Sequence, residues 1–158
     1  MTGDLPRGRT DSATRFISAP ADAIYRAFVD PAAWLEWLPP KGMTGEIYEF
    51  DARPGGTYRM ALTYVGDHAN AGKADANTDI VEGRFAELVP DVRVVQIVTF
   101  ESSDPRFSGE MRMTWSILSK AAGSEVSIIA ENVPPGISKA DHDVGLRSTL
   151  ENLAQFVE

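Results

Sequence analysis

The chain has 158 residues and a formal net charge of −8, with 43% hydrophobic and 24% charged residues. This length and composition predict one globular, soluble domain, and the acidic balance, without a lysine or arginine cluster, argues against nucleic acid or an anionic membrane as a partner. The absence of cysteine excludes disulfides, thiolate nucleophiles and cysteine-ligated metals, and is compatible with a cytoplasmic location. No run of residues is apolar enough to span a membrane, and the polar N-terminus predicts no signal peptide.

The N-terminal part of the chain predicts a strand and two short helices. We expect the strand over Ser12–Ser18. Ser18 or Ala19 is the expected N-cap of a first helix that ends near Asp30, and the second helix is expected over Pro31–Leu38, where two prolines stop it.

From residue 45 onward the apolar residues recur with a period of two, which is typical of strands. A polar stretch without large apolar residues, Gly66–Asn77, interrupts this part and is predicted to be a long loop. Six further strands are expected: Gly45–Phe50, Thr57–Val65, Thr78–Leu88, Val92–Phe100, Gly109–Leu118 and Glu125–Val133.

The last segment, Ser138–Glu158, has the clearest helical period of the chain. Ser138 is the expected N-cap, with Asp141 three residues later in a capping-box pattern. Four apolar residues at steps of four, three and four form one face, namely Leu146, Leu150, Leu153 and Val157. The opposite face carries Asp143, Arg147 and Glu151 and is predicted to be solvated.

A long helix with one apolar face must bury that face, and almost everything before it is predicted strand. The fold class is therefore α+β, with one terminal helix laid across one antiparallel sheet. Residues 12–158 form this single domain, and residues 1–11 are predicted to be a flexible tail.

Several short sequences occur in an order that resembles a known superfamily. They are Ala19–Phe28 followed by Asp30-Pro31 and Trp34, Arg53–Gly56, Glu82–Phe85 with Pro90, and the closing Gly145–Leu153. Together they resemble the START-like (SRPBCC) superfamily, in its branch related to the heat-shock chaperone ATPase activator and the calicheamicin-resistance protein.

This resemblance implies a helix-grip fold, in which a curved seven-stranded antiparallel sheet wraps around a long C-terminal helix, with two short helices after the first strand. It also implies an apolar cavity between sheet and helix. Members of the superfamily bind lipids, polyketides, hormones or other apolar molecules, some are aromatase/cyclases, and some bind chaperones.

The candidate ligand-binding residues come from two strands with alternating patterns and from the second helix. The alternative is that these residues simply pack the core face of the sheet. Two features favour a ligand: methionine adapts to irregular shapes, and tyrosine and tryptophan carry polar groups that a dry core would have to satisfy separately. The apolar candidates are Trp37, Leu38, Tyr58, Met60, Leu62, Tyr64, Met111, Met113 and Trp115. Trp34 is interpreted as a packing residue.

Charged and titratable candidates are fewer. Glu82 and Arg84 lie two apart on one face of a strand, either inside the cavity, where they would orient a polar group, or on the solvent face. Neither histidine, His68 or His142, has a metal-ligand spacing, and we expect no metal and no cofactor. Gly145 lies inside the last helix and has two interpretations. Either it allows the helix backbone to pack closely on the sheet, or it is a flexible position that lets the helix shift when a ligand enters.

Three functions are compatible with these features. We favour a small cytoplasmic protein, monomeric or homodimeric, that binds an apolar or aromatic small molecule. The alternatives are a polyketide cyclase-type or hydrolytic enzyme with an acid or base in the cavity, and a chaperone-interacting module.

Overall fold

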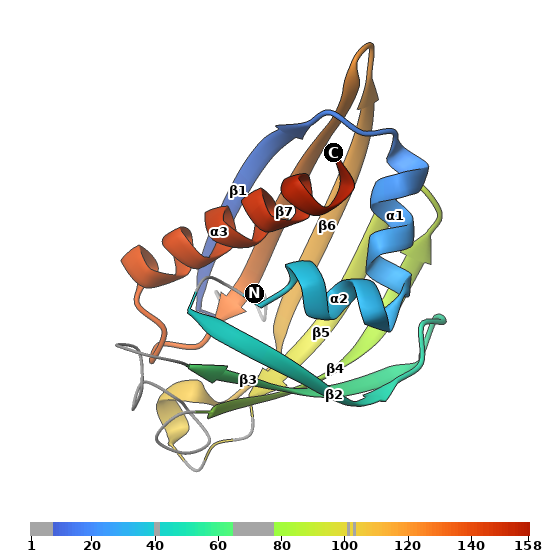
Figure 1. Cartoon of the computed structure of the whole chain (residues 1–158). Helices are drawn as coiled ribbons and strands as arrows, with labels where there is room; N and C mark the ends of the chain where they lie inside the picture. The colour runs from blue at the N-terminus through green and yellow to red at the C-terminus, as the bar shows by residue number, and fades with distance from the viewer. Residues whose placement is uncertain (1–7, 40–41, 65–77, 101, 103) are drawn as a thin grey trace, which may run out of the picture.

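The computed structural model describes residues 8–39, 42–64, 78–100, 102 and 104–158. The predicted loop Gly66–Asn77 therefore lies outside the described residues, together with His68. Within the described part of the chain, seven strands and three α-helices follow the predicted order (Figure 1).

Most elements begin and end within two residues of their predicted bounds. The strands are β1 Arg9–Ile17, β2 Met43–Phe50, β3 Thr57–Tyr64, β4 Thr78–Val89, β5 Arg93–Phe100, β6 Met111–Lys120 and β7 Gly123–Val133. The helices are α1 Ala21–Val29, α2 Pro31–Trp37 and α3 Lys139–Val157, with a short 3-10 helix at Pro105–Phe107.

One antiparallel sheet with the strand order β1-β7-β6-β5-β4-β3-β2 forms the body of the protein. β1 and β2 are its two edges, so the connection through α1 and α2 crosses the full width of the sheet. The curved sheet wraps around α3, and all three helices lie on its concave face (Figure 1). This arrangement confirms the predicted helix-grip fold of the α+β class.

The helix starts follow capping chemistry, with one exception. Ser138 accepts a hydrogen bond from the backbone nitrogen of Asp141, as predicted for α3, and Asp30 accepts one from the nitrogen of Ala32 at the start of α2. In α1 the N-cap is Pro20, which makes no side-chain cap. The prediction of Ser18 or Ala19 at this position was therefore wrong, because the extended chain continues one residue further than expected.

The first strand also begins earlier than predicted. Residues 9–11, which we assigned to the flexible tail, belong to β1, and Arg9 pairs with Val133 in β7. The side chain of Asp11 is fully buried by its ion pairs. Residues 9–11 were predicted to lie in the tail because polar residues at a chain end are usually solvated. In the structure the carboxylate of Asp11 is buried because oppositely charged neighbours bind it.

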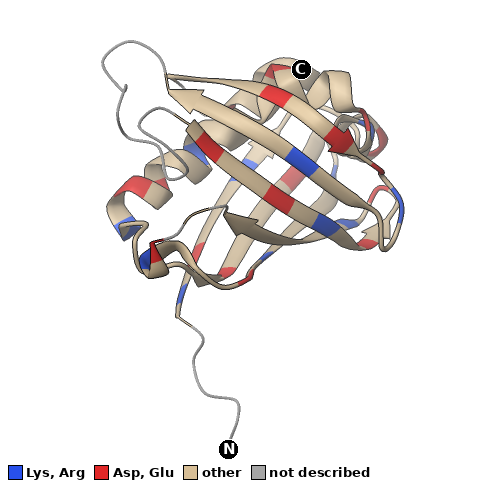
Figure 2. Ribbon diagram, turned by 90° about the horizontal axis from the view of Figure 1, so that it is seen from below, with Lys and Arg blue, Asp and Glu red and all other residues tan. Residues whose placement is uncertain are grey.

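The outer face of the sheet carries interspersed charges of both signs (Figure 2). Glu82 pairs with Arg59 at 3.0 Å and Arg84 pairs with Glu110 at 3.3 Å. Side chains alternate along β4, so that Val81 points inward and Glu82 and Arg84 point outward. Such exposed ion pairs contribute little to stability, but they show which face of β4 is exposed to solvent.

Candidate functional site: a pocket under the first half of the last helix

A pocket of about 920 Å³ lies between the sheet and the first half of α3. Eight of the eleven candidate ligand-binding residues line it, namely Leu38, Tyr58, Met60, Leu62, Tyr64, Met111, Met113 and Trp115. The volume is within the range of small-molecule sites in proteins.

The walls of the pocket follow from strand geometry. Every second residue of β3, from Tyr58 to Tyr64, faces α3, and the same alternation brings Met111, Met113 and Trp115 of β6 to this side. β3 and β6 are separated by β4 and β5, whose inner face contributes Val81 and Val98 to the same wall. The two sequence patterns thus belong to one continuous surface.

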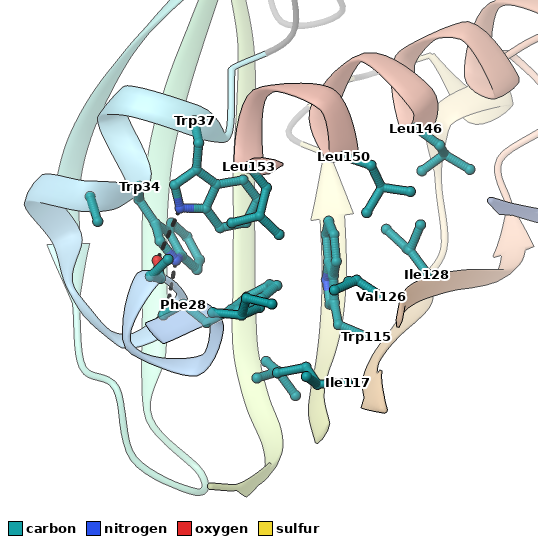
Figure 3. Close-up of a cluster of buried hydrophobic side chains, with 14 of the residues drawn as sticks. Phe28, Trp34, Trp37, Trp115, Ile117, Val126, Ile128, Leu146, Leu150 and Leu153 are labelled. Carbon is teal, nitrogen blue, oxygen red and sulfur yellow. Dashed lines mark hydrogen bonds between the residues drawn. The ribbon is translucent and has the colours of Figure 1, made fainter. Parts of the chain in front are cut away.

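Trp37 does not line the pocket. Its side chain is fully buried, its indole nitrogen donates to the carbonyl of Ala27 at 3.0 Å, and its ring contacts Phe28 and Trp115 edge-on. Trp34 is anchored in the same way, through a 2.7 Å bond to the carbonyl of Phe28 (Figure 3). Both tryptophans hold α1 and α2 together over the sheet, which agrees with the packing interpretation of Trp34 and corrects the placement of Trp37.

Glu82 and Arg84 do not line the pocket either. Both side chains lie on the outer face of the sheet in the ion pairs described above. Their predicted position inside the cavity is corrected in favour of the solvent-face alternative, because the side chains of Glu82 and Arg84 alternate along β4 with the inward-facing, buried Val81 and Phe85.

A cluster of charged side chains borders one end of the pocket, where β1 passes under the start of α3. Arg9 holds both oxygens of Asp11 through its Nε, at 2.9 and 3.0 Å, and donates from Nη2 to the carbonyl of Ile137. Nδ1 of His142 lies 2.8 Å from Asp11 Oδ2, and Lys139 adds a longer contact of 3.4 Å. His142 lines the pocket, whereas Asp11 lies behind it.

The protonation of this cluster follows from its geometry. Burial alone raises the pKa of Asp11, but the hydrogen bonds and charges of Arg9 and His142 outweigh it and lower the pKa to about 2. The carboxylate is therefore ionised at neutral pH and only accepts, so Nδ1 of His142 must be the donor. In a neutral ring this leaves Nε2 as a proton acceptor.

A second polar pair lies on the pocket wall. Asp79 is buried and accepts a hydrogen bond from the hydroxyl of Tyr64 at 3.4 Å. Burial raises the pKa of Tyr64 to about 12, and the negative charges of Asp79 and Asp141 add to the effect. The phenol therefore stays protonated and donates a hydrogen bond at neutral pH.

Sequence reasoning missed several polar residues of the pocket. Arg147 and Glu151 were assigned to the solvated face of α3; Arg147 is exposed, as predicted, and Glu151 is half-buried, but both also line the pocket. His142 was noted as a residue without a metal-ligand spacing, but it was not placed at the pocket. The signal that could have found it was its position in the first turn of the helix that the resemblance places over the cavity.

Gly145 also lines the pocket, and a methyl group added there would meet no atom within 4 Å. Its interpretation as a position of close packing on the sheet is therefore wrong.

The described residues contain no group of three histidine or carboxylate side chains that could hold a metal ion. None of the described helices combines the length and apolarity needed to cross a bilayer.

A seven-stranded antiparallel sheet that grips a C-terminal helix, with two short helices after the first strand, defines the START-like class of folds. The sequence model of the family described as "Activator of Hsp90 ATPase homolog 1-like protein" matches residues 18–158. The chain belongs to this family. No functionally curated protein matches the chain.

Solved structures support the same assignment. Protein CV1439 from Chromobacterium violaceum is 32% identical, with a TM-score of 0.82, and the match covers 95% of this chain and 98% of that one. An AHSA1-like protein from Aeromonas hydrophila has 14% identity and a TM-score of 0.70 over 94% of this chain and 92% of that one. DynU16, a protein in the dynemicin biosynthetic locus, has 17% identity and a TM-score of 0.66 over 93% and 46%. The last two show the fold alone.

Proposed function

We propose that the protein binds an apolar or aromatic small molecule in the pocket between the sheet and α3. The observation that carries this proposal is the pocket itself, about 920 Å³ in volume, with methionine and aromatic walls and a few polar groups. Sites of this kind bury most of a small ligand's surface and orient it through a few polar contacts. A cytoplasmic location is part of the proposal, and the lack of cysteine is compatible with it.

Native mass spectrometry after exposure to an extract of apolar metabolites tests this proposal. We expect a discrete added mass on the wild-type protein. Leu62→Trp fills the pocket from β3 and should abolish it, whereas Leu118→Trp makes the same change at a residue that is 55% exposed and should retain it. An added mass that survives in both variants would place the ligand elsewhere.

The absence of added mass under all conditions would contradict the binding proposal. The chaperone-interacting alternative would then take its place, and it predicts capture of an Hsp90-type chaperone by both variants equally.

A second candidate function is favoured by the Asp11–His142 pair. An imidazole held by a buried carboxylate, with its other nitrogen free to accept a proton, is the arrangement of a general base. Among the described residues, Nε2 of His142 has no hydrogen-bond partner. The enzyme alternative therefore has a specific residue at the pocket, whereas Glu82 and Arg84 no longer support it.

The probe 5-nitrobenzisoxazole tests this alternative without knowledge of the substrate. A base removes its C3 proton while the nitrogen–oxygen bond breaks, and the product, 2-cyano-4-nitrophenolate, is coloured. A pocket base predicts saturable turnover that His142→Asn removes. Turnover equal in wild type and His142→Asn would exclude His142 as a pocket base.

A further inference from the structure

Gln96, in the middle of β5, is a buried polar residue on the pocket wall. Only 4% of its surface is exposed, and it is one of the residues that line the pocket. Its Oε1 accepts a hydrogen bond from the indole nitrogen of Trp115 at 3.0 Å. Its partners in the neighbouring strands are Phe85 and Met113, which are both apolar.

The bond to Trp115 determines how the amide of Gln96 is oriented. An indole nitrogen can only donate, so the amide must turn its oxygen towards Trp115. The NH₂ group then points away from the indole. Among the described residues, this nitrogen has no hydrogen-bond partner, although it is not sealed from the pocket, because no fully buried polar side-chain atom lacks a partner.

The Gln96 nitrogen is open to the pocket but has no partner among the described residues, so a ligand that covers it must supply an acceptor or leave a buried donor unsatisfied, which is costly. We propose that Gln96 is a specificity-determining residue, whose Nε2 donates to a neutral oxygen, a carbonyl or an ether, on an otherwise apolar ring system. The inference rests on the proposed binding function and narrows it from apolar molecules in general to oxygen-bearing ones.

The surroundings of Gln96 explain why the oxygen is neutral. The paired residues in β4 and β6, Phe85 and Met113, offer no positive charge or further donor. A carboxylate would lose its hydration against a single amide, which costs far more than the transfer of a ketone. Ligands with a charged group are therefore expected to place that group near Arg147 and His142, which also line the pocket.

A matched pair of probes tests the inference. Fluorene and 9-fluorenone have nearly the same flat shape and differ in a methylene against a carbonyl. Equilibrium dialysis of the full chain gives a Kd for each, and the quantity of interest is the ratio of the fluorene Kd to the fluorenone Kd. One neutral hydrogen bond predicts that this ratio falls about five-fold when the Gln96 donor is removed.

Two variants remove the donor in different ways. Gln96→Met leaves an apolar side chain of similar length. Gln96→Glu, dialysed at a pH high enough to ionise its carboxyl group, keeps an acceptor for Trp115 and has no donor, whereas a protonated carboxyl group would still donate. The second variant keeps the test valid if loss of the Trp115 bond unfolds the first. Gln155→Met, at an exposed position of α3, is the matched control and should leave the ratio unchanged.

The outcomes separate the two proposals. A ratio that falls in both Gln96 variants supports the inference. A ratio that stays unchanged in them, with both probes bound, overturns the role of Gln96 and leaves the binding function standing. If the wild-type protein retains neither probe, the proposed function is contradicted for flat apolar rings, and the role of Gln96 falls with it.

Discussion

The two halves of α3 cover very different parts of the same sheet. The second half, with Leu150 and Leu153, packs on the aromatic cluster of α1, α2 and β6 (Figure 3), where Trp34 and Trp37 are almost completely buried. The first half covers the open pocket and is bordered by charged residues. One end of the molecule is therefore organised as a close-packed core and the other as a site.

Physical chemistry separates the two ends as well. At the packed end, the indole nitrogens of Trp34 and Trp37 each have a backbone carbonyl as partner, so these tryptophans are buried without loss of hydrogen bonds. At the pocket end, the amide nitrogen of Gln96 has no partner among the described residues, and Gly145 faces open space. The contrast teaches that the two ends differ in how their polar groups are satisfied, while Tyr58 and Trp115, which line the pocket and contact the aromatic cluster, join them.

The largest expected difference concerns truncation of a side chain at each end. Trp37→Ala should lower the free energy of unfolding by about 3–5 kcal/mol, because it opens a cavity among fully buried rings. Met113→Ala, on the half-buried pocket wall, should cost only about 1 kcal/mol, since part of its surface already faces open space. Urea denaturation at neutral pH measures both values. Equal losses would mean that the pocket end is packed as tightly as the core.

Acid should weaken the pocket end through Asp11. Its folded-state pKa of about 2 lies below the ordinary value of 3.8, so its contribution is present above pH 4 and is lost as the pH falls towards 2. The expected loss is on the order of 2 kcal/mol. Denaturation curves between pH 5 and pH 2 measure it.

Asp11→Asn provides the control for this pH dependence. The variant should be less stable at pH 5 and should have a flatter pH profile than the wild-type protein. The lowered pKa values of Asp104 and Glu87, on the exposed surface, affect both proteins alike. Parallel profiles would show that Asp11 is not the group that links stability to acid.

Most of the fold could be predicted because the sequence patterns were local. Alternation in β3 and β6 located the pocket walls, and the apolar period of α3 located the helix face that the sheet covers. Proline and aspartate mark the starts of the short helices, because proline fits the first helical turn and aspartate caps its backbone nitrogens. These signals depend on residues close together in the chain, so one sequence is enough to read them.

The polar part of the site could not be predicted in the same way. Asp11 and His142 are 131 residues apart and meet only because β1 is the edge strand that passes under α3. Trp37 was misplaced because a tryptophan near a cavity mouth and a tryptophan in a core have the same local pattern. The position of β1 at the sheet edge and the packing of α2 on α1 and β6 decide these placements, and both depend on contacts between separate elements of the fold.

The smallest expected effect, and the one with the clearest sign, concerns Gly145. Glycine inside a helix costs about 1 kcal/mol relative to alanine, and the added methyl group would meet no atom within 4 Å. Gly145→Ala should therefore raise the free energy of unfolding by about 1 kcal/mol and slow the exchange of fluorenone, as measured by denaturation and stopped-flow fluorescence. Destabilisation would instead mean that α3 packs closely on the sheet at this residue, and the distinction between its two halves would not hold.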